Sequence, residues 1–352
     1  MKAIKLLLAC VFALIPVSTT FAAGDKTLDA YIPMDEGIEE HWAYEEIDDL
    51  INADIIDGFM DAENNMYVKP KENITRAQFV KIIVSSLGLQ TEGLGKTFSD
   101  VKQGVWYTDY IRIASELGII DGNPDGSFAP NANITRAEMT KVIVLSFDKT
   151  VEFPETSSII FTDVNENNWA YEFINKASAA KVVNGFNNKF NPKNFANRAE
   201  AIAMIHRALQ KEQSNLTEDE VLTSFLKDHI TQENMLAETN LTEELISLYG
   251  ENGTGYYRAE GTELGGMLLP LEEGDEYSIT IDDENLALEV VDKSDRFATI
   301  VATGMTFTVV YKSEGVNMEV SDSMDGEYKL KKNLVSGEWK IYSYYPYFEE
   351  EL

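Results

Sequence analysis

Apolar residues recur in one pattern three times within the first 210 positions of the chain. After each of three tryptophans, apolar residues stand five and eight positions further on, which is the spacing of one face of a helix. We therefore predict an amphipathic helix after Trp42, Trp106 and Trp169. A glycine follows sixteen positions after each tryptophan, at Gly58, Gly122 and Gly185. We expect these glycines to stop the helices in a left-handed conformation.

A second helix is predicted in each repeat by the way it starts. The strings Thr75-Arg-Ala-Gln78, Thr135-Arg-Ala-Glu138 and Asn197-Arg-Ala-Glu200 have the spacing of a capping box. The helices that follow are apolar nearly all round, so we expect them to meet in a common centre. One pair of helices of this size cannot bury its own apolar face. We therefore predict a mainly α N-terminal half, with three helix-loop-helix repeats (34–90, 91–150 and 151–210) around a central three-helix bundle.

An arginine opens each of these second helices, at Arg76, Arg136 and Arg198. A helix N-terminus carries partial positive charge, so a cation there is mildly unfavourable. The guanidinium either binds a carboxylate or phosphate ligand or pairs with an acidic residue of the neighbouring repeat. The tryptophans likewise either pack in the core or offer an apolar platform to a sugar ring. The sequence leaves both pairs of alternatives open.

Beyond residue 210 the pattern changes. Helical spacing runs from a capping box at Thr217 to Ile230, and again from Leu241 to Tyr249, where Gly250 is expected to stop the helix. Strands are then predicted at 277–281, 286–291, 297–302, 306–312, 327–331 and 338–344. Helices followed by strands predict an α+β domain with an antiparallel sheet over residues 211–352.

The charge distribution supports this division. The net charge is −31, which excludes nucleic acid and anionic membranes as natural partners. Residues 38–210 carry 16 basic and 25 acidic residues, a net charge of −9, whereas residues 211–352 carry 10 and 31, a net charge of −21. The change in charge places a domain boundary near residues 211–217.

The N-terminus has the features of a secretory signal. Lys2 and Lys5 precede an apolar run, and Thr20-Phe-Ala22 offers small residues before a cut ahead of Ala23. We predict a signal peptide at 1–22, a linker at 23–33 and no membrane span, because the apolar run is too short. Cys10, the only cysteine, resembles a lipidation site, but the apolar run continues past it, so we assign it to the signal. The exported chain then has neither disulfides nor a catalytic thiol.

The repeats resemble S-layer homology domains. The resemblance covers residues 34–210 and is carried by Phe98-Ser-Asp100, Phe161-Thr-Asp163, the string from Gly122 to Pro130 and the Ile-Thr-Arg-Ala-Glu helix start. It implies a three-repeat spindle whose grooves bind secondary wall polymers linked to peptidoglycan, commonly with pyruvate ketals on N-acetylmannosamine. Carried over by motif, the arginines hold the ketal carboxylate and the tryptophans line the sugar. The glycines allow close approach of the backbone, and Asp100 and Asp163 order the grooves.

Two repeats depart from the family pattern. Repeat 1 has Met34-Asp-Glu36 in place of Phe-x-Asp and a longer loop, and repeat 3 has Ala196-Asn197 in place of Ile-Thr. We therefore expect at least one complete groove, centred on repeat 2 and its Arg136. Two weak grooves on one chain would still raise retention through effective concentration.

The last hairpin, from Gly326 to Tyr342, resembles that of nuclear-transport-factor-like and ketosteroid-isomerase-like rolls. Such a fold hosts catalytic, ligand-binding or dimerising proteins and does not decide among them. We find no nucleophile, phosphate-binding or dinucleotide motif, and we predict no metal, no cofactor and no catalytic residue. The prediction is a non-enzymatic, cell-surface anchoring protein of a bacterium, with an unidentified C-terminal partner. The alternatives are an enzyme or ligand-binding protein with its site in the C-terminal roll, or a structural component of the envelope.

Overall fold

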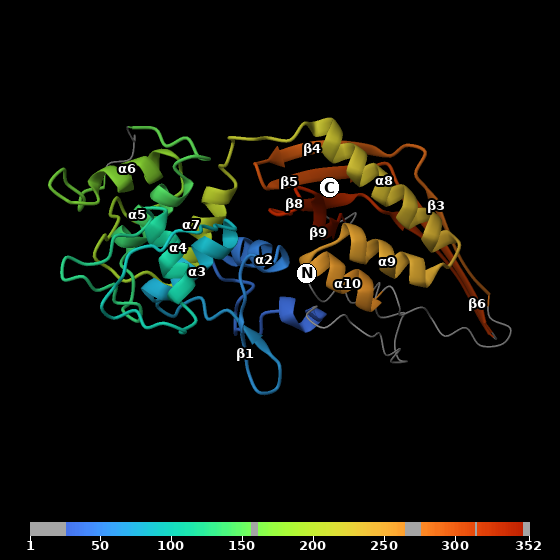
Figure 1. The fold of residues 1–352 in the computed structure, drawn as a ribbon. Helices are drawn as coiled ribbons and strands as arrows, with labels where there is room; N and C mark the ends of the chain where they lie inside the picture. Colours follow the sequence, from blue (N-terminus) through green and yellow to red (C-terminus); the bar gives the residue numbers. More distant parts are fainter. Residues whose placement is uncertain (1–25, 156–160, 265–275, 314, 348–352) are drawn as a thin grey trace. The chain divides into compact units, whose positions relative to one another are not determined.

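The computed structural model describes residues 26–155, 161–264, 276–313 and 315–347 (Figure 1). The chain forms two compact units. The first comprises Pro33–Ile51 and Ile55–Leu216, and the second comprises the described residues of Met1–Ile32, Asn52–Asp54 and Thr217–Leu352. The proposed signal peptide at 1–22 lies outside the described residues. Within the described parts, no helix has both the length and the apolar character needed to cross a membrane.

The first unit contains the three predicted helix pairs. The helices after the tryptophans are α2 (Tyr44–Asn52), α4 (Thr108–Glu116) and α6 (Tyr171–Ala179), and those that begin with arginine are α3 (Arg76–Ser86), α5 (Arg136–Phe147) and α7 (Arg198–Leu209). A short hairpin, β1 (Phe59–Met60) and β2 (Met66–Tyr67), fills the longer loop of repeat 1. Helices α3, α5 and α7 bury most of their side chains and pack together, which confirms the central bundle.

The partners of the outer helices come from the preceding repeat. Helix α4 of repeat 2 packs on α3 of repeat 1, and α6 of repeat 3 packs on α5 of repeat 2. The third pairing closes the circle, because α2 bonds to α7 through Asp49–His206, 2.8 Å, and Glu46–Arg207, 2.9 Å. Each repeat is therefore completed by its neighbour, as expected when one helix pair cannot bury its own apolar face.

A closed ring of backbone hydrogen bonds joins the three helix starts. Ile74 N donates to Ala196 O, Ala196 N to Ile134 O, and Ile134 N back to Ile74 O, at 2.9–3.1 Å. All three residues are buried. The predicted capping boxes follow at once: each N-cap side chain accepts from the backbone of the third helical residue, whose side chain accepts from the N-cap backbone. The ring and the caps together fix where each helix begins.

The prediction that Gly58, Gly122 and Gly185 stop the helices is wrong. The helices end earlier, and the left-handed residues just beyond their ends are Asp54, Gly118 and Lys181. All three glycines are required by packing, and Gly122 also has a left-handed φ of +77°, although it lies beyond the helix end. A Cβ atom would lie 2.2 Å from Met66 Sδ at Gly58, and 2.3 Å from the rings of Phe98 and Phe161 at the other two.

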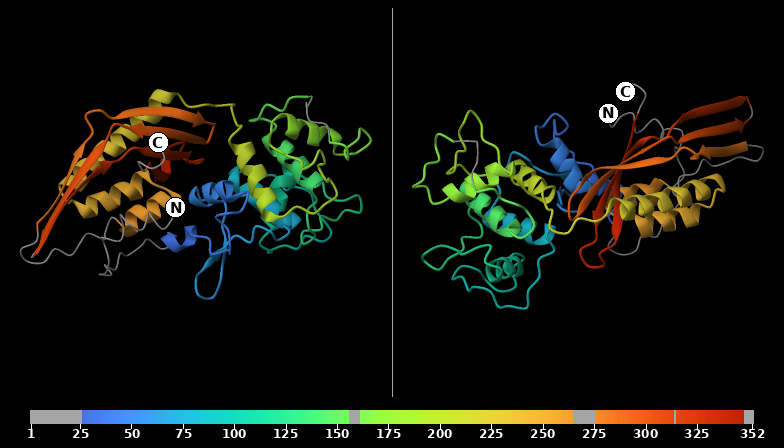
Figure 2. Two further views of the ribbon diagram at one scale, coloured as in Figure 1. Left: turned by 180° about the vertical axis from the view of Figure 1, so that it is seen from behind. Right: turned by 90° about the horizontal axis from the view of Figure 1, so that it is seen from above.

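The second unit has the predicted order of helices followed by an antiparallel sheet. Its helices are α8 (Asp219–Glu238), α9 (Thr242–Asn252) and α10 (Gly255–Leu264). One sheet has the order β4-β5-β8-β9 and a second has the order β3-β6-β7. The helices gather on one face of the strands (Figure 2), where Leu226 and Ile230 of α8 and Tyr257 of α10 join the sheet's core. The strands are β3 (Glu276–Asp282), β4 (Ala287–Lys293), β5 (Phe297–Thr303), β6 (Thr306–Ser313), β7 (Val316–Ser323), β8 (Gly326–Lys332) and β9 (Trp339–Pro346).

Several local predictions for this unit need correction. Helix α8 begins at Asp219 without the expected side-chain cap, and α9 continues through Gly250 to end before Gly253. Helix α10 and strand β7 were not predicted; β7 is largely exposed and polar, so it lacks the apolar alternation that reveals a strand. The resemblance to nuclear-transport-factor-like rolls stays a prediction.

The segment predicted as a linker, 23–33, is partly folded. It contains the 3-10 helix η1 (Leu28–Tyr31), whose Leu28 amide donates to Glu263 at 2.8 Å. Tyr31 is buried, with its ring edge-on to Tyr256 at 6.2 Å between centroids. Residues 28–32 therefore belong to the second unit, and the first unit begins at Pro33.

Candidate functional site

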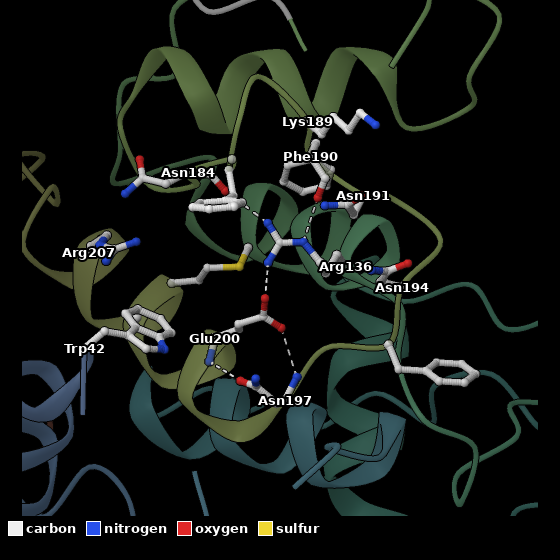
Figure 3. A pocket seen from close by; sticks show the side chains of 15 residues that line it. Trp42, Arg136, Asn184, Lys189, Phe190, Asn191, Asn194, Asn197, Glu200 and Arg207 are labelled. Atoms are coloured by element: carbon white, nitrogen blue, oxygen red, sulfur yellow. Dashed lines mark hydrogen bonds and ion pairs between the residues drawn. The ribbon is translucent and has the colours of Figure 1, made fainter. Parts of the chain in front are cut away.

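One groove of the first unit collects predicted site residues from all three repeats. Its cavity of about 520 Å³ is lined by Trp42 of repeat 1, Arg136 of repeat 2, and Gly185 and Glu200 of repeat 3. We call it the Arg136 groove (Figure 3). Because the first helix of each repeat packs on the second helix of another, residues that are about 60 to 150 positions apart meet here.

Arg136 is held on several sides within this groove (Figure 3). Its Nε donates to the carbonyl of Phe190 at 2.8 Å, and its Nη2 donates to the carbonyl of Asn184 at 3.0 Å. Its Nη1 forms an ion pair with Glu200 of the next repeat. The guanidinium also lies 4.6 Å from the centre of the Phe190 ring. The charge of Arg136 is therefore already matched by a carboxylate of the protein.

Arg76 repeats this arrangement between repeats 1 and 2. Its Nε donates to Phe128 O at 2.8 Å, and its Nη1 pairs with Glu138 at 2.6 Å. Of the two alternatives open at the sequence level, pairing with an acidic residue of the neighbouring repeat therefore holds for Arg76 and Arg136. Arg76, Gly122 and Trp169 line neither the Arg136 groove nor the groove that contains Arg198.

Arg198 differs from the other two arginines. It lines a second groove of about 420 Å³, the Arg198 groove, together with Trp106 of repeat 2 and Gly58, Gln78 and Lys81 of repeat 1. Its Nε donates to Val68 O at 2.7 Å, and its guanidinium lies 4.5 Å from the Phe59 ring centre. Within the described parts of the chain, no carboxylate forms an ion pair with it. Burial lowers the pKa of Arg198, although the charges of Glu72 and Asp35 act in the opposite direction.

The predicted aspartates order the loops that hold the arginines. Asp100 accepts hydrogen bonds from the amides of Phe128 and Ala129 at 2.8 and 2.7 Å. Asp163 accepts in the same way from Phe190 and Asn191, both at 2.8 Å. The carbonyls of Phe128 and Phe190 are those that accept from Arg76 and Arg136. Each aspartate therefore helps to position an arginine indirectly, because it holds the loop residue whose carbonyl accepts from that arginine.

Repeat 1 has the same device, which the sequence analysis missed. Asp35 accepts from the amides of Val68 and Lys69 at 2.6 and 2.8 Å, and Val68 O accepts from Arg198. Asp35 stands seven residues before its tryptophan, whereas Asp100 and Asp163 stand six before theirs. A search that allowed one inserted residue would have found it.

The three tryptophans do not pack in the core. Trp42, Trp106 and Trp169 are 59%, 54% and 60% exposed. Two of them line the grooves beside an arginine. An exposed indole beside a guanidinium suits a sugar that carries a negative charge, because the ring offers an apolar face and the cation a charged partner.

A buried polar cluster lies in the second unit. His229 is fully buried, its Nε2 lies 2.7 Å from Tyr257 Oη, and its Nδ1 lies 3.3 Å from Asn252 Nδ2. Tyr249 donates to Glu233 at 2.6 Å. Burial lowers the pKa of His229, with Glu233 opposing the shift. The cluster ties α8, α9 and α10 together, and no described cavity reaches it.

Comparisons with known proteins agree with the three repeats. The S-layer homology domain model matches residues 38–80, 97–140 and 160–202. Among curated proteins, the chain is 35% identical over 179 residues to an amylopullulanase of Thermoanaerobacterium thermosulfurigenes, covering 49% of this chain and 9% of that protein. It is 34% identical over 180 residues to the exoglucanase XynX of Acetivibrio thermocellus, covering 49% and 16%. A cellulosome-anchoring protein of the same species is 32% identical over 150 residues, covering 41% and 33%.

These matches involve only part of each protein. The matched region amounts to a third or less of each of these three relatives and to no more than half of this chain. The three matches of the family model fall on the repeats of the first unit. The chain therefore carries three S-layer homology domains, one in each repeat.

Proposed function

We propose that the chain is an exported protein that anchors itself to the bacterial cell wall by binding a peptidoglycan-linked secondary polysaccharide through the grooves of its first unit. The second unit is the module that this anchor displays at the cell surface. The observation that carries the proposal is the meeting of an exposed tryptophan and an arginine in each of the two grooves. The names of the surface-anchoring relatives point in the same direction.

The chemistry of the grooves, taken together, favours a polysaccharide that carries acidic groups over a peptide or a nucleic acid. An indole offers its apolar face to the C–H side of a pyranose ring. A guanidinium binds a carboxylate through two parallel hydrogen bonds, a geometry that a pyruvate ketal on the sugar would satisfy. The net charge of −9 over residues 38–210 would repel polyanions in general, so the positive charge is local to the grooves.

Retention on purified wall sacculi tests the proposal. The full chain is expected to sediment with untreated sacculi and to stay in solution when acid extraction has first removed the secondary polymer. Exchange of Trp42 and Trp106 for Ala removes both apolar platforms and is expected to lower retention at least ten-fold. Exchange of Leu94, which is 90% exposed and lines neither groove, is the matched control. Equal retention on treated and untreated sacculi would show that the proposal is wrong.

A further inference from the structure

The three repeats differ at the residue that faces the arginine of the preceding repeat in the ring. This residue is the third of each central helix and closes its capping box. It is Glu138 in repeat 2 and Glu200 in repeat 3, but Gln78 in repeat 1. The change from glutamate to glutamine keeps the size of the side chain and removes its charge.

In repeats 2 and 3 the glutamate makes two different contacts. One oxygen accepts from the N-cap amide, at 2.8 Å for Glu138 and 3.0 Å for Glu200, and the other pairs with the neighbouring arginine. In repeat 1 the single oxygen of Gln78 accepts from Thr75 N at 2.9 Å. The remaining atom is an amide nitrogen, which donates and therefore cannot accept from Arg198.

Arg198 is left without the partner that the other arginines have. Its side chain lines the groove while the whole residue is only 6% exposed, and no ion pair to it exists among the described residues. Lys81 adds a second cation to the lining, against one carboxylate, Asp57. A buried guanidinium that lacks a direct ion pair is unfavourable even where more distant carboxylates such as Glu72 and Asp35 act on it, and a carboxylate supplied by a ligand lowers that cost.

We propose that the Arg198 groove is the subsite for a sugar that carries a carboxylate, and that Gln78 determines this specificity. In the Arg136 groove Glu200 already occupies the guanidinium, so this groove takes the uncharged sugars of the same chain. Because Arg198 Nε is used by Val68 O, the ligand carboxylate meets Nη1 and Nη2. Trp106 lies in the same lining and provides the apolar face for the ring that bears the carboxylate. The inference rests on the proposed function and divides it between the two grooves.

An exchange of single residues between the grooves tests this assignment. Gln78→Glu gives repeat 1 the residue that repeats 2 and 3 have at this position. The capping box and the fold are therefore expected to remain. The reciprocal variant is Glu200→Gln, which frees Arg136. The probes are the methyl glycoside of N-acetylmannosamine with a 4,6-pyruvate ketal and the same glycoside without it, with binding to the full chain measured by calorimetry. Thermal unfolding of each variant shows that it is folded.

The natural chain is expected to bind the ketal at least ten-fold more tightly than the neutral glycoside. Gln78→Glu should abolish this preference and leave binding of the neutral glycoside unchanged, whereas Glu200→Gln should add a second ketal site. An undiminished ketal preference in folded Gln78→Glu would overturn the assignment. If the natural chain holds untreated sacculi but does not distinguish the two glycosides, the assignment alone fails. If it binds neither sacculi nor glycoside, the proposed function fails with it.

Discussion

Replacement of Asp35 by alanine should destabilise the first unit and loosen Arg198. The carboxylate of Asp35 accepts two backbone hydrogen bonds, from the buried Val68 and the exposed Lys69. Lys69 has a φ of +56°, a left-handed conformation that costs a residue with a Cβ about 1–2 kcal/mol and persists because its surroundings hold it. Ala129 and Asn191 occupy the same place in the other loops, at φ of +58° and +57°.

The size of the effect follows from these contacts. A hydrogen bond to a charged group contributes about 1.5–3 kcal/mol, so two would give about 3–6 kcal/mol. Lys69 is exposed and Val68 is buried, so water replaces the carboxylate more readily at the amide of Lys69 than at the amide of Val68. We therefore expect the lower end, about 3 kcal/mol. In a unit of this size that loss lowers the melting temperature by about 6–12 °C.

Thermal unfolding, monitored by tryptophan fluorescence, measures this fall in melting temperature. Three of the four tryptophans lie in the first unit, so their signal reports mainly on that unit. The matched control is Glu36→Gln, which removes one negative charge from an exposed neighbouring residue. Hydrogen exchange should also accelerate at the amides of Val68 and Lys69 in the Asp35→Ala variant. Equal melting temperatures of Asp35→Ala and the control would show that the two hydrogen bonds of Asp35 do not stabilise this loop.

Two further predictions concern other parts of the chain. The second unit should lose stability as the pH falls below about 6.5, by up to about 1.4 kcal/mol per pH unit, because the unfolded state then binds a proton that folded His229, with its lowered pKa, does not. The free energy of unfolding, measured with urea from pH 7 to 5, should fall less steeply with pH in His229→Gln than in the natural chain. Equal pH dependence of the two would contradict the prediction. Gly185→Ala should cost about 1–3 kcal/mol and weaken retention on sacculi, because its Cβ would lie 2.3 Å from the Phe161 ring. Gly250→Ala is the control, because a Cβ at Gly250 would have no atom within 4 Å, and it should neither destabilise the chain nor weaken retention. Equal melting temperatures of the two variants would contradict the packing argument.

The structure also changes which arginine is expected to matter most for binding an acidic sugar. Repeat 2 has the cleanest motif, and its Arg136 is therefore the first candidate from sequence. In the folded unit Arg136 is paired with Glu200, whereas Arg198, from the repeat that departs most at its helix start, forms no ion pair within the described residues. The residue that makes Arg198 differ from Arg136 is Gln78, which lies in repeat 1, whereas the two arginines lie in repeats 3 and 2.

Much of the architecture follows from local rules that the sequence displays. Capping boxes, apolar spacing and matched intervals reveal six helices and three repeats, because these signals depend on residues within a few positions of one another. The exposed polar strand β7 and the helix α10 lack such signals and were missed. The helix stops were misplaced because a glycine can be required by a close contact as well as by a left-handed turn.

Only the tertiary structure determines which residues of different repeats contact one another. Sequence alone shows that Arg76, Arg136 and Arg198 are equivalent, and it shows a glutamine at one of three glutamate positions. It does not show that each arginine faces the capping residue of the next repeat, because that meeting depends on how the ring of helix starts closes. The exposed tryptophans, and the buried arginine without an ion-pair partner in the described residues, arise from this closure, since the packing of separate repeats determines which side chains meet.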